Sequence, residues 1–172
     1  MSFYIRKVDT SKWEDELPED GDVLDMAVDG ITNCCKTYEN CLSVWKTESL
    51  DPYSEQNKKL LTAMAMSLDK PIAMTVVFLS DNEIDSLELE LIENDGMTPY
   101  TEQASLHRDI SNLTLKKIGH LGWVIHQKVN DDAEIKIISE EELVSFVKGI
   151  FPNADALPEE KRNQKKWKKI YE

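Results

Sequence analysis

His107 and Asp109 form one residue pair in this 172-residue chain that could act in catalysis. They stand two residues apart in a segment, 106–113, that we expect to form a short strand. Alternate side chains of a strand point to the same face, so the imidazole and the carboxylate would lie side by side as a general base and its partner. We favour a polar surface strand instead, because a strand exposed to solvent would have the same sequence pattern without any catalytic role.

Three cysteines offer a second possible chemistry. Cys34, Cys35 and Cys41 are odd in number and clustered, which indicates reduced thiols rather than a disulfide framework. With one of the three histidines they would supply four metal ligands, but structural zinc sites usually consist of two short-spaced pairs. We therefore expect burial on the apolar side of a helix, and no metal.

Sequence motifs for a specific reaction are missing. The dinucleotide fingerprint, the phosphate loop, the helical His-Glu-x-x-His motif and the Gly-x-Ser-x-Gly turn are absent, and the chain has only six glycines. The tripeptide His107-Arg108-Asp109 matches the kinase catalytic loop by chance, because no glycine-rich loop precedes it. We predict no cofactor.

Charge is the most informative property of the chain. The 33 Asp and Glu residues outnumber 20 Lys and Arg residues, which gives a formal charge of -13. Residues 14–29 and 71–107 each contain eight acidic residues and no Lys or Arg. Such stretches repel nucleic acid and favour a basic protein partner, although simple solubility explains either one taken alone.

The second acidic stretch contains our predicted partner-binding surface. The run 86–91 alternates Leu and Glu, which predicts a half-solvated strand, antiparallel near a sheet edge and hairpinned to the strand before it. The carboxylates expected to meet the partner are Asp81, Glu83, Asp85, Glu88 and Glu90.

The last fifteen residues reverse the sign of the charge. Residues 158–172 carry a net charge of +3, which leaves -16 on residues 1–157. We therefore distinguish an acidic α/β domain, 1–157, from a basic amphipathic segment, 158–172. We expect this segment to fold back on its own domain, with docking to a partner second and nucleic-acid contact last. A docked partner would meet Lys165, Trp167, Lys169 and Tyr171.

Hydrophobic periodicity supplies the elements that would position these residues. The alternation of strands and helices predicts a single-domain α/β sandwich with a mixed sheet of about five to six strands and about four helices, plus a basic C-terminal helix. The apolar run 72–79 is expected at the sheet centre. Leu115 and Ile118 are expected to face inward on a helix capped by Thr114. The expected strands are 3–8, 41–47, 72–79, 86–91, 106–113 and 135–138, and the expected helices are 23–36 (capped by Asp22), 52–68, 115 onward and 140–150.

Composition also constrains location. No apolar run approaches the roughly 18 residues of a membrane span, and the N-terminal residues lack the pattern of a secretion signal. We expect a cytoplasmic protein that does not enter membranes.

Three classes of function remain: a binding module, an enzyme and a subunit of a homo-oligomer. We favour a non-catalytic module of antitoxin-like, immunity-like or accessory type that binds a larger, basic effector protein. The alternative is a small hydrolase or transferase that uses His107 and Asp109. A homo-oligomer is the third option, with Trp45, Trp123 and Trp167 as interface anchors, although the first two better suit a core.

Overall fold

A six-stranded sheet of order β4-β5-β2-β1-β3-β6 lies at the centre of the computed structural model, which describes residues 1–13 and 28–172. The α/β class and the six strands are confirmed. The strands are β1 (Phe3–Val8), β2 (Leu42–Thr47), β3 (Met74–Ser80), β4 (Glu90–Glu93), β5 (His107–Ser111) and β6 (Lys136–Ile138).

The strand directions correct our prediction of a mixed sheet, because every neighbouring pair is antiparallel. Parallel neighbours require a connection that crosses the sheet and returns to its starting end. Here the connection between β1 and β2 contains a helix but re-enters the sheet at the end where it left. Alternation of strands and helices therefore gave the class but not the strand direction.

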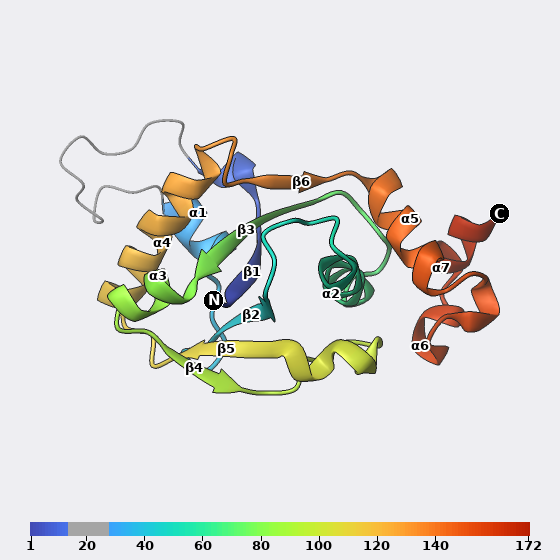
Figure 1. Ribbon diagram of the computed structural model, residues 1–172, viewed down its shortest axis with the longest axis horizontal. Coiled ribbons are helices and arrows are strands. Elements are labelled where there is room, and N and C mark those ends of the chain that lie inside the picture. Colours follow the sequence, from blue (N-terminus) through green and yellow to red (C-terminus); the bar gives the residue numbers. More distant parts are fainter. Residues whose placement is uncertain (14–27) are drawn as a thin grey trace.

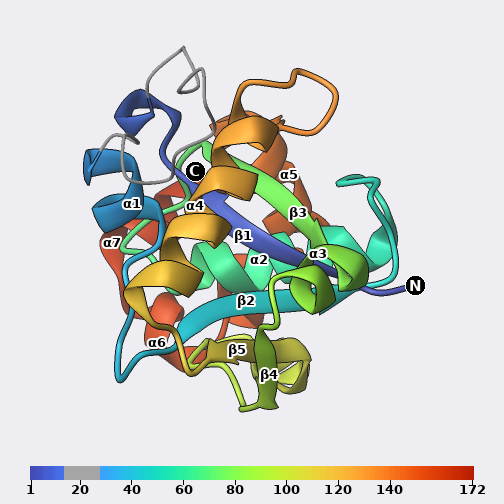
Figure 2. The ribbon, with the colours of Figure 1, turned by 90° about the vertical axis from the view of Figure 1, so that its left-hand side faces the viewer.

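Helices cover both faces of the sheet (Figure 1), and the rotated view places α4 in front of β1 and β3 with α2 behind them (Figure 2). The α-helices are α1 (Val28–Cys34), α2 (Glu55–Met66), α3 (Asp81–Ser86), α4 (Leu115–Val129), α5 (Glu140–Ile150), α6 (Glu159–Arg162) and α7 (Lys165–Lys168). Short 3-10 turns are η1 (Thr10–Lys12), η3 (Thr101–Leu106), η4 (Ala154–Ala156) and η5 (Lys169–Tyr171).

Two hydrophobic cores lie on opposite faces of the sheet. Residues of α2, α5 and the C-terminal segment form one core, and residues of α1, α3 and α4 form the other. Val76 and Val77 of β3 contribute to different cores, so this apolar strand is covered on both faces as predicted. It is not the middle strand, because β1 and β2 occupy the sheet centre.

Two predicted helix caps are confirmed, whereas the helix expected from residue 52 begins only at Glu55, where the Ser54 side chain caps it. The Thr114 side chain accepts a hydrogen bond from the backbone of Lys117, and Ser139 forms a reciprocal capping box with Glu142. Leu115 is an exception, since 91% of it is exposed instead of facing inward. It occupies the first position of α4, and the buried residues of this helix begin only at Leu121.

Residues 86–89, where we predicted the first part of a strand, instead lie at the end of α3 and in the turn that follows it. Ser80 and Glu83 make a capping box that begins α3, and Glu88 then adopts a positive φ of 51°. The strand β4 starts only at Glu90 and pairs with β5, not with β3. Its antiparallel position at the sheet edge agrees with the prediction, but the predicted hairpin does not form.

The C-terminal segment forms two short helices and a 3-10 turn instead of one helix. Trp167 is fully buried in the same core as α2 and α5, so the expected folding back onto the domain is confirmed. This segment lies at the opposite end of the molecule from α3 and α4 (Figure 1).

Some predictions concern residues outside the described part. The cap at Asp22, the start of the first helix and most of the acidic stretch 14–29 lie there. The described part of that helix confirms the burial of Cys34 and Cys35, which are 2% and 1% exposed. Over 1–13 and 28–172, we find no helix with the length and apolar character needed to cross a bilayer.

Candidate functional site

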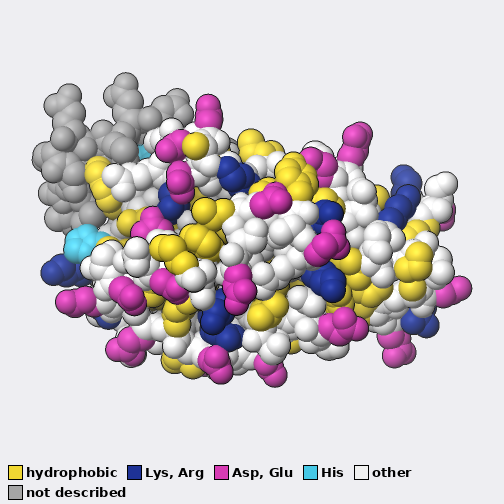
Figure 3. Space-filling view, in the orientation of Figure 1, with side chains coloured by type: hydrophobic (Ala, Val, Ile, Leu, Met, Phe, Trp, Pro, Cys, Tyr) yellow, Lys and Arg dark blue, Asp and Glu magenta, His cyan; other side chains and the backbone are white. Residues whose placement is uncertain are grey.

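The acidic surface, which we define as Asp81, Glu83, Asp85, Glu88 and Glu90, follows α3, the turn after it and the first residue of β4. Asp and Glu side chains are visible over this part of the molecule in Figure 3. The five carboxylates divide into two that stabilise the fold and three that face solvent.

Asp81 is committed to the fold. One carboxylate oxygen accepts a hydrogen bond from the backbone N–H of Ser2 at 2.5 Å, and the other accepts one from the Tyr4 hydroxyl at 2.9 Å. These hydrogen bonds hold the pKa of Asp81 below its usual range. Burial and the neighbouring carboxylate raise the pKa of Tyr4 to about 12. Asp81 thus ties the N-terminal strand to α3.

Glu83 is also engaged. Its carboxylate accepts hydrogen bonds from the backbone and side chain of Ser80, and it forms an ion pair of 2.9 Å with Lys128 of α4. Lys128 binds Glu134 at 2.8 Å as well. Glu83 therefore fixes α3 against α4, and its charge is largely compensated.

Asp85, Glu88 and Glu90 are the exposed members. Within the described ranges, neither Asp85 nor Glu88 has a side-chain hydrogen bond or ion pair; Lys117 binds the backbone carbonyl of Glu88 at 2.7 Å. The Glu90 carboxylate accepts a hydrogen bond from the neutral amide of Asn112 at 2.5 Å. These three carboxylates keep their negative charge available to a cation.

Two further acids extend this surface beyond our predicted set. Glu93 of β4 forms an ion pair of 2.9 Å with Arg108, and Asp95 is exposed just after the strand. Both belong to the same stretch without Lys or Arg, so the sequence contained the information needed to include them.

The predicted residues of the C-terminal segment have different fates. Trp167 is fully buried, and its indole N–H donates to the carbonyl of Leu68 at 3.4 Å. The Tyr171 hydroxyl donates to the carbonyl of Phe151 at 2.6 Å. Lys165 and Lys169 are exposed. The aromatic residues therefore hold the segment on its own domain, and only the lysines face outward.

The alternative catalytic pair does lie on one face of β5, with His107 Nε2 3.9 Å from a carboxylate oxygen of Asp109. Nδ1 of His107 lies 2.8 Å from the carbonyl oxygen of Asn94, which can only accept, so this nitrogen carries the proton. The carboxylate of Asp109 instead accepts hydrogen bonds from Ser43 at 3.2 Å and from the Asn94 side chain at 2.7 Å.

This order of contacts is unsuited to a hydrolytic triad. In such a triad the histidine stands between the nucleophile and the carboxylate, whereas here Asp109 bonds the hydroxyl of Ser43 directly. His107 is 7% exposed and packs edge-to-face on Trp45, with ring centroids 5.2 Å apart. Its contacts are those of a structural histidine.

Burial makes Cys35 a poor nucleophile. All three cysteines are free, and burial raises the pKa of Cys35 to about 12, which disfavours the thiolate that attacks substrates or binds metals. Among the residues that the structure describes, no group of three or more His, Cys, Asp or Glu side chains could hold a metal ion.

Comparison of the chain with protein-family models, curated proteins and solved structures found no match. The functional interpretation therefore depends on the geometry of the chain itself.

Proposed function

We propose that this protein is a non-catalytic binding module of antitoxin-like, immunity-like or accessory type, whose acidic surface binds a basic surface of a larger effector protein. The observation that carries the proposal is the exposure of three carboxylates, Asp85, Glu88 and Glu90, on a stretch without Lys or Arg.

Electrostatics gives the physical basis. Uncompensated carboxylates at a surface raise the local concentration of a basic partner and speed its association, and they repel nucleic acid. The rigid placement of α3 by Asp81 and Glu83 supports the proposal, because fixed charges lose less conformational entropy on binding than mobile ones.

A cytoplasmic site of action accompanies the proposal. The three unpaired thiols are those expected in a reducing compartment, where structural disulfides are rare. The effector would then be met inside the cell.

The test uses the full-length tagged protein as bait in a lysate of its native host. We expect one basic protein to co-purify in a fixed ratio and to dissociate at high salt, because ionic contacts are screened. The basic protein should no longer co-purify with the variant Asp85→Lys/Glu88→Lys/Glu90→Lys.

A matched control reverses three exposed acids elsewhere, as Glu48→Lys/Asp132→Lys/Asp155→Lys. This control changes the net charge equally and should retain the partner. Equal retention by both variants would reject the acidic surface as the binding site. Loss of cellular function in His107→Ala and Asp109→Ala, with both proteins folded and the charge-reversed variant active, would favour the enzyme instead.

A further inference from the structure

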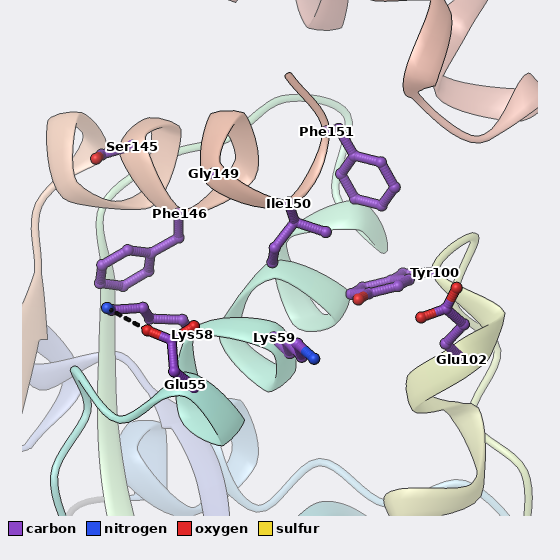
Figure 4. A pocket seen from close by; sticks show the side chains of 10 residues that line it. All are labelled: Glu55, Lys58, Lys59, Tyr100, Glu102, Ser145, Phe146, Gly149, Ile150 and Phe151. Atoms are coloured by element: carbon purple, nitrogen blue, oxygen red, sulfur yellow. Dashed lines mark hydrogen bonds and ion pairs between the residues drawn. The ribbon is translucent and has the colours of Figure 1, made fainter. Parts of the chain in front are cut away.

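A cavity of about 670 Å³ opens between α2, α5 and the start of η3 (Figure 4). None of its lining residues belongs to the acidic surface. Its volume falls within the range of roughly 300–1,000 Å³ that is typical of small-molecule sites. The lining residues are Glu55, Lys58, Lys59, Tyr100, Glu102, Ser145, Phe146, Gly149, Ile150 and Phe151.

The apolar wall of the cavity is preformed. Tyr100 and Phe151 pack edge-to-face with ring centroids 5.1 Å apart, and Phe146 makes a similar contact of 6.1 Å with Tyr53. Tyr100 and Phe146 are 5% and 8% exposed, so the rings are held by the core rather than by solvent-facing contacts. Fixed aromatic rings of this kind favour a flat apolar ligand.

Gly149, in the last turn of α5, leaves the cavity wall bare. A Cβ atom built there would meet no heavy atom within 4 Å. Gly30 and Gly96 differ, because a Cβ at either would lie 2.6 Å from Trp13 or 2.7 Å from Trp45. Glycine disfavours a helix relative to alanine, and nothing packed against Gly149 requires it. It does leave room for a ligand close to the helix backbone.

Two acidic and two basic side chains line the cavity. Glu55 and Lys58 form an ion pair of 2.9 Å, so they compensate each other. Glu102 lies beside Tyr100 in Figure 4 and contributes to raising the pKa of that phenol, after burial itself. Lys59 is exposed and forms no ion pair with any residue in 1–13 or 28–172, although its charge adds to that of Lys58 in lowering the pKa of Glu55.

We infer that this cavity binds a small aromatic carboxylate, with its ring among Tyr100, Phe146 and Phe151 and its carboxylate on Lys59. The inference concerns a second site and does not depend on the proposed binding of a basic effector.

The experiment compares two probes that share one ring, indole-3-acetate and tryptamine, by calorimetry and by amide chemical shifts of the full-length protein. We expect indole-3-acetate to bind at least tenfold more tightly than tryptamine and to shift the amide of Gly149. Absence of binding by indole-3-acetate, or equal binding of both probes, would overturn the inference.

Variants then locate the site. Gly149→Leu should narrow the cavity beside the backbone of α5 and weaken binding, whereas Gly149→Ala leaves most of that space open and should keep it. Lys59→Gln should weaken the binding of indole-3-acetate about tenfold. Lys116→Gln on α4 changes another exposed helical lysine and is the matched control. Unchanged binding in folded Gly149→Leu would place the ligand elsewhere and reject the site.

Discussion

The acidic surface and the basic C-terminal segment begin as equivalent features of the sequence and end with opposite roles in the fold. Each is enriched in charges of one sign with apolar residues interspersed, although the segment also contains three Glu residues. In the acidic surface, Asp85, Glu88 and Glu90 remain exposed. In the segment, Trp167 and Lys161 are buried, at 0% and 4% exposed, and their donors meet the same carbonyl of Leu68.

The difference shows that a charge run alone does not identify a binding surface. What matters is whether its side chains already have partners within the molecule. The segment uses its apolar and cationic groups to complete the core of α2 and α5, whereas the acidic surface keeps three of its five carboxylates for solvent. Variants at both regions can test this contrast.

Trp167→Ala should have the largest effect. It removes a fully buried indole and its hydrogen bond to Leu68, and large-to-small changes of this kind destabilise by about 3–5 kcal/mol. The free energy of unfolding in urea measures the loss. Lys165→Ala, an exposed neighbour, should stay within about 0.5 kcal/mol. A wild-type value for Trp167→Ala would mean that the segment is not docked in solution.

Lys161→Ala should cost less, about 1–3 kcal/mol. The change removes the ammonium group that donates to the Leu68 carbonyl at 3.0 Å and lies 5.7 Å from the Trp167 ring centroid. Lys161→Met keeps the apolar stem, so the difference between the two variants separates packing from hydrogen bonding. If Lys161→Ala is as stable as Lys165→Ala, the contrast between buried and exposed lysines fails.

Asp81→Asn should have the smallest effect, about 1 kcal/mol near neutral pH, because it weakens the hydrogen bonds from Ser2 and Tyr4. The folded-state pKa of Asp81 is lowered, so its carboxylate stabilises the fold above the ordinary aspartate pKa of about 3.9. That stabilisation is lost as the pH falls through the lowered folded-state pKa.

The measurement for Asp81→Asn is therefore the unfolding free energy from about pH 7 to about pH 3, where its difference from wild type should shrink. Asp85→Asn is the matched change on an exposed carboxylate and should alter stability by less than about 0.5 kcal/mol. Equal losses in the two variants would erase the distinction between structural and exposed acids.

Local sequence rules predicted much of the fold. Ser139 with Glu142, and Thr114, began helices where expected, because a cap depends on residues within one helical turn. The same rule applied to Ser80 and Glu83 would have predicted α3, but the Leu and Glu alternation that follows them suggested a strand. The capping box prevails there because it satisfies backbone donors that the alternation leaves open.

The candidate site was predicted in part. The base-free stretch located the acidic surface, and it also contains Glu93 and Asp95, which we omitted. The cavity between α2 and α5 was not predicted, because its lining residues come from three separate segments of the chain. No local pattern brings Lys59, Tyr100 and Gly149 together.

The sequence by itself determined the α/β class, the starts of α4 and α5, the burial of Cys34 and Cys35 and the separation of charge between the domain and its last fifteen residues. These properties depend on composition, periodicity and capping, which act over a few residues. Only the tertiary structure decided that β4 pairs with β5, that Asp81 holds the N-terminus and that Trp167 is buried. Those outcomes depend on contacts between distant segments, whose loop closure and packing a local pattern does not specify.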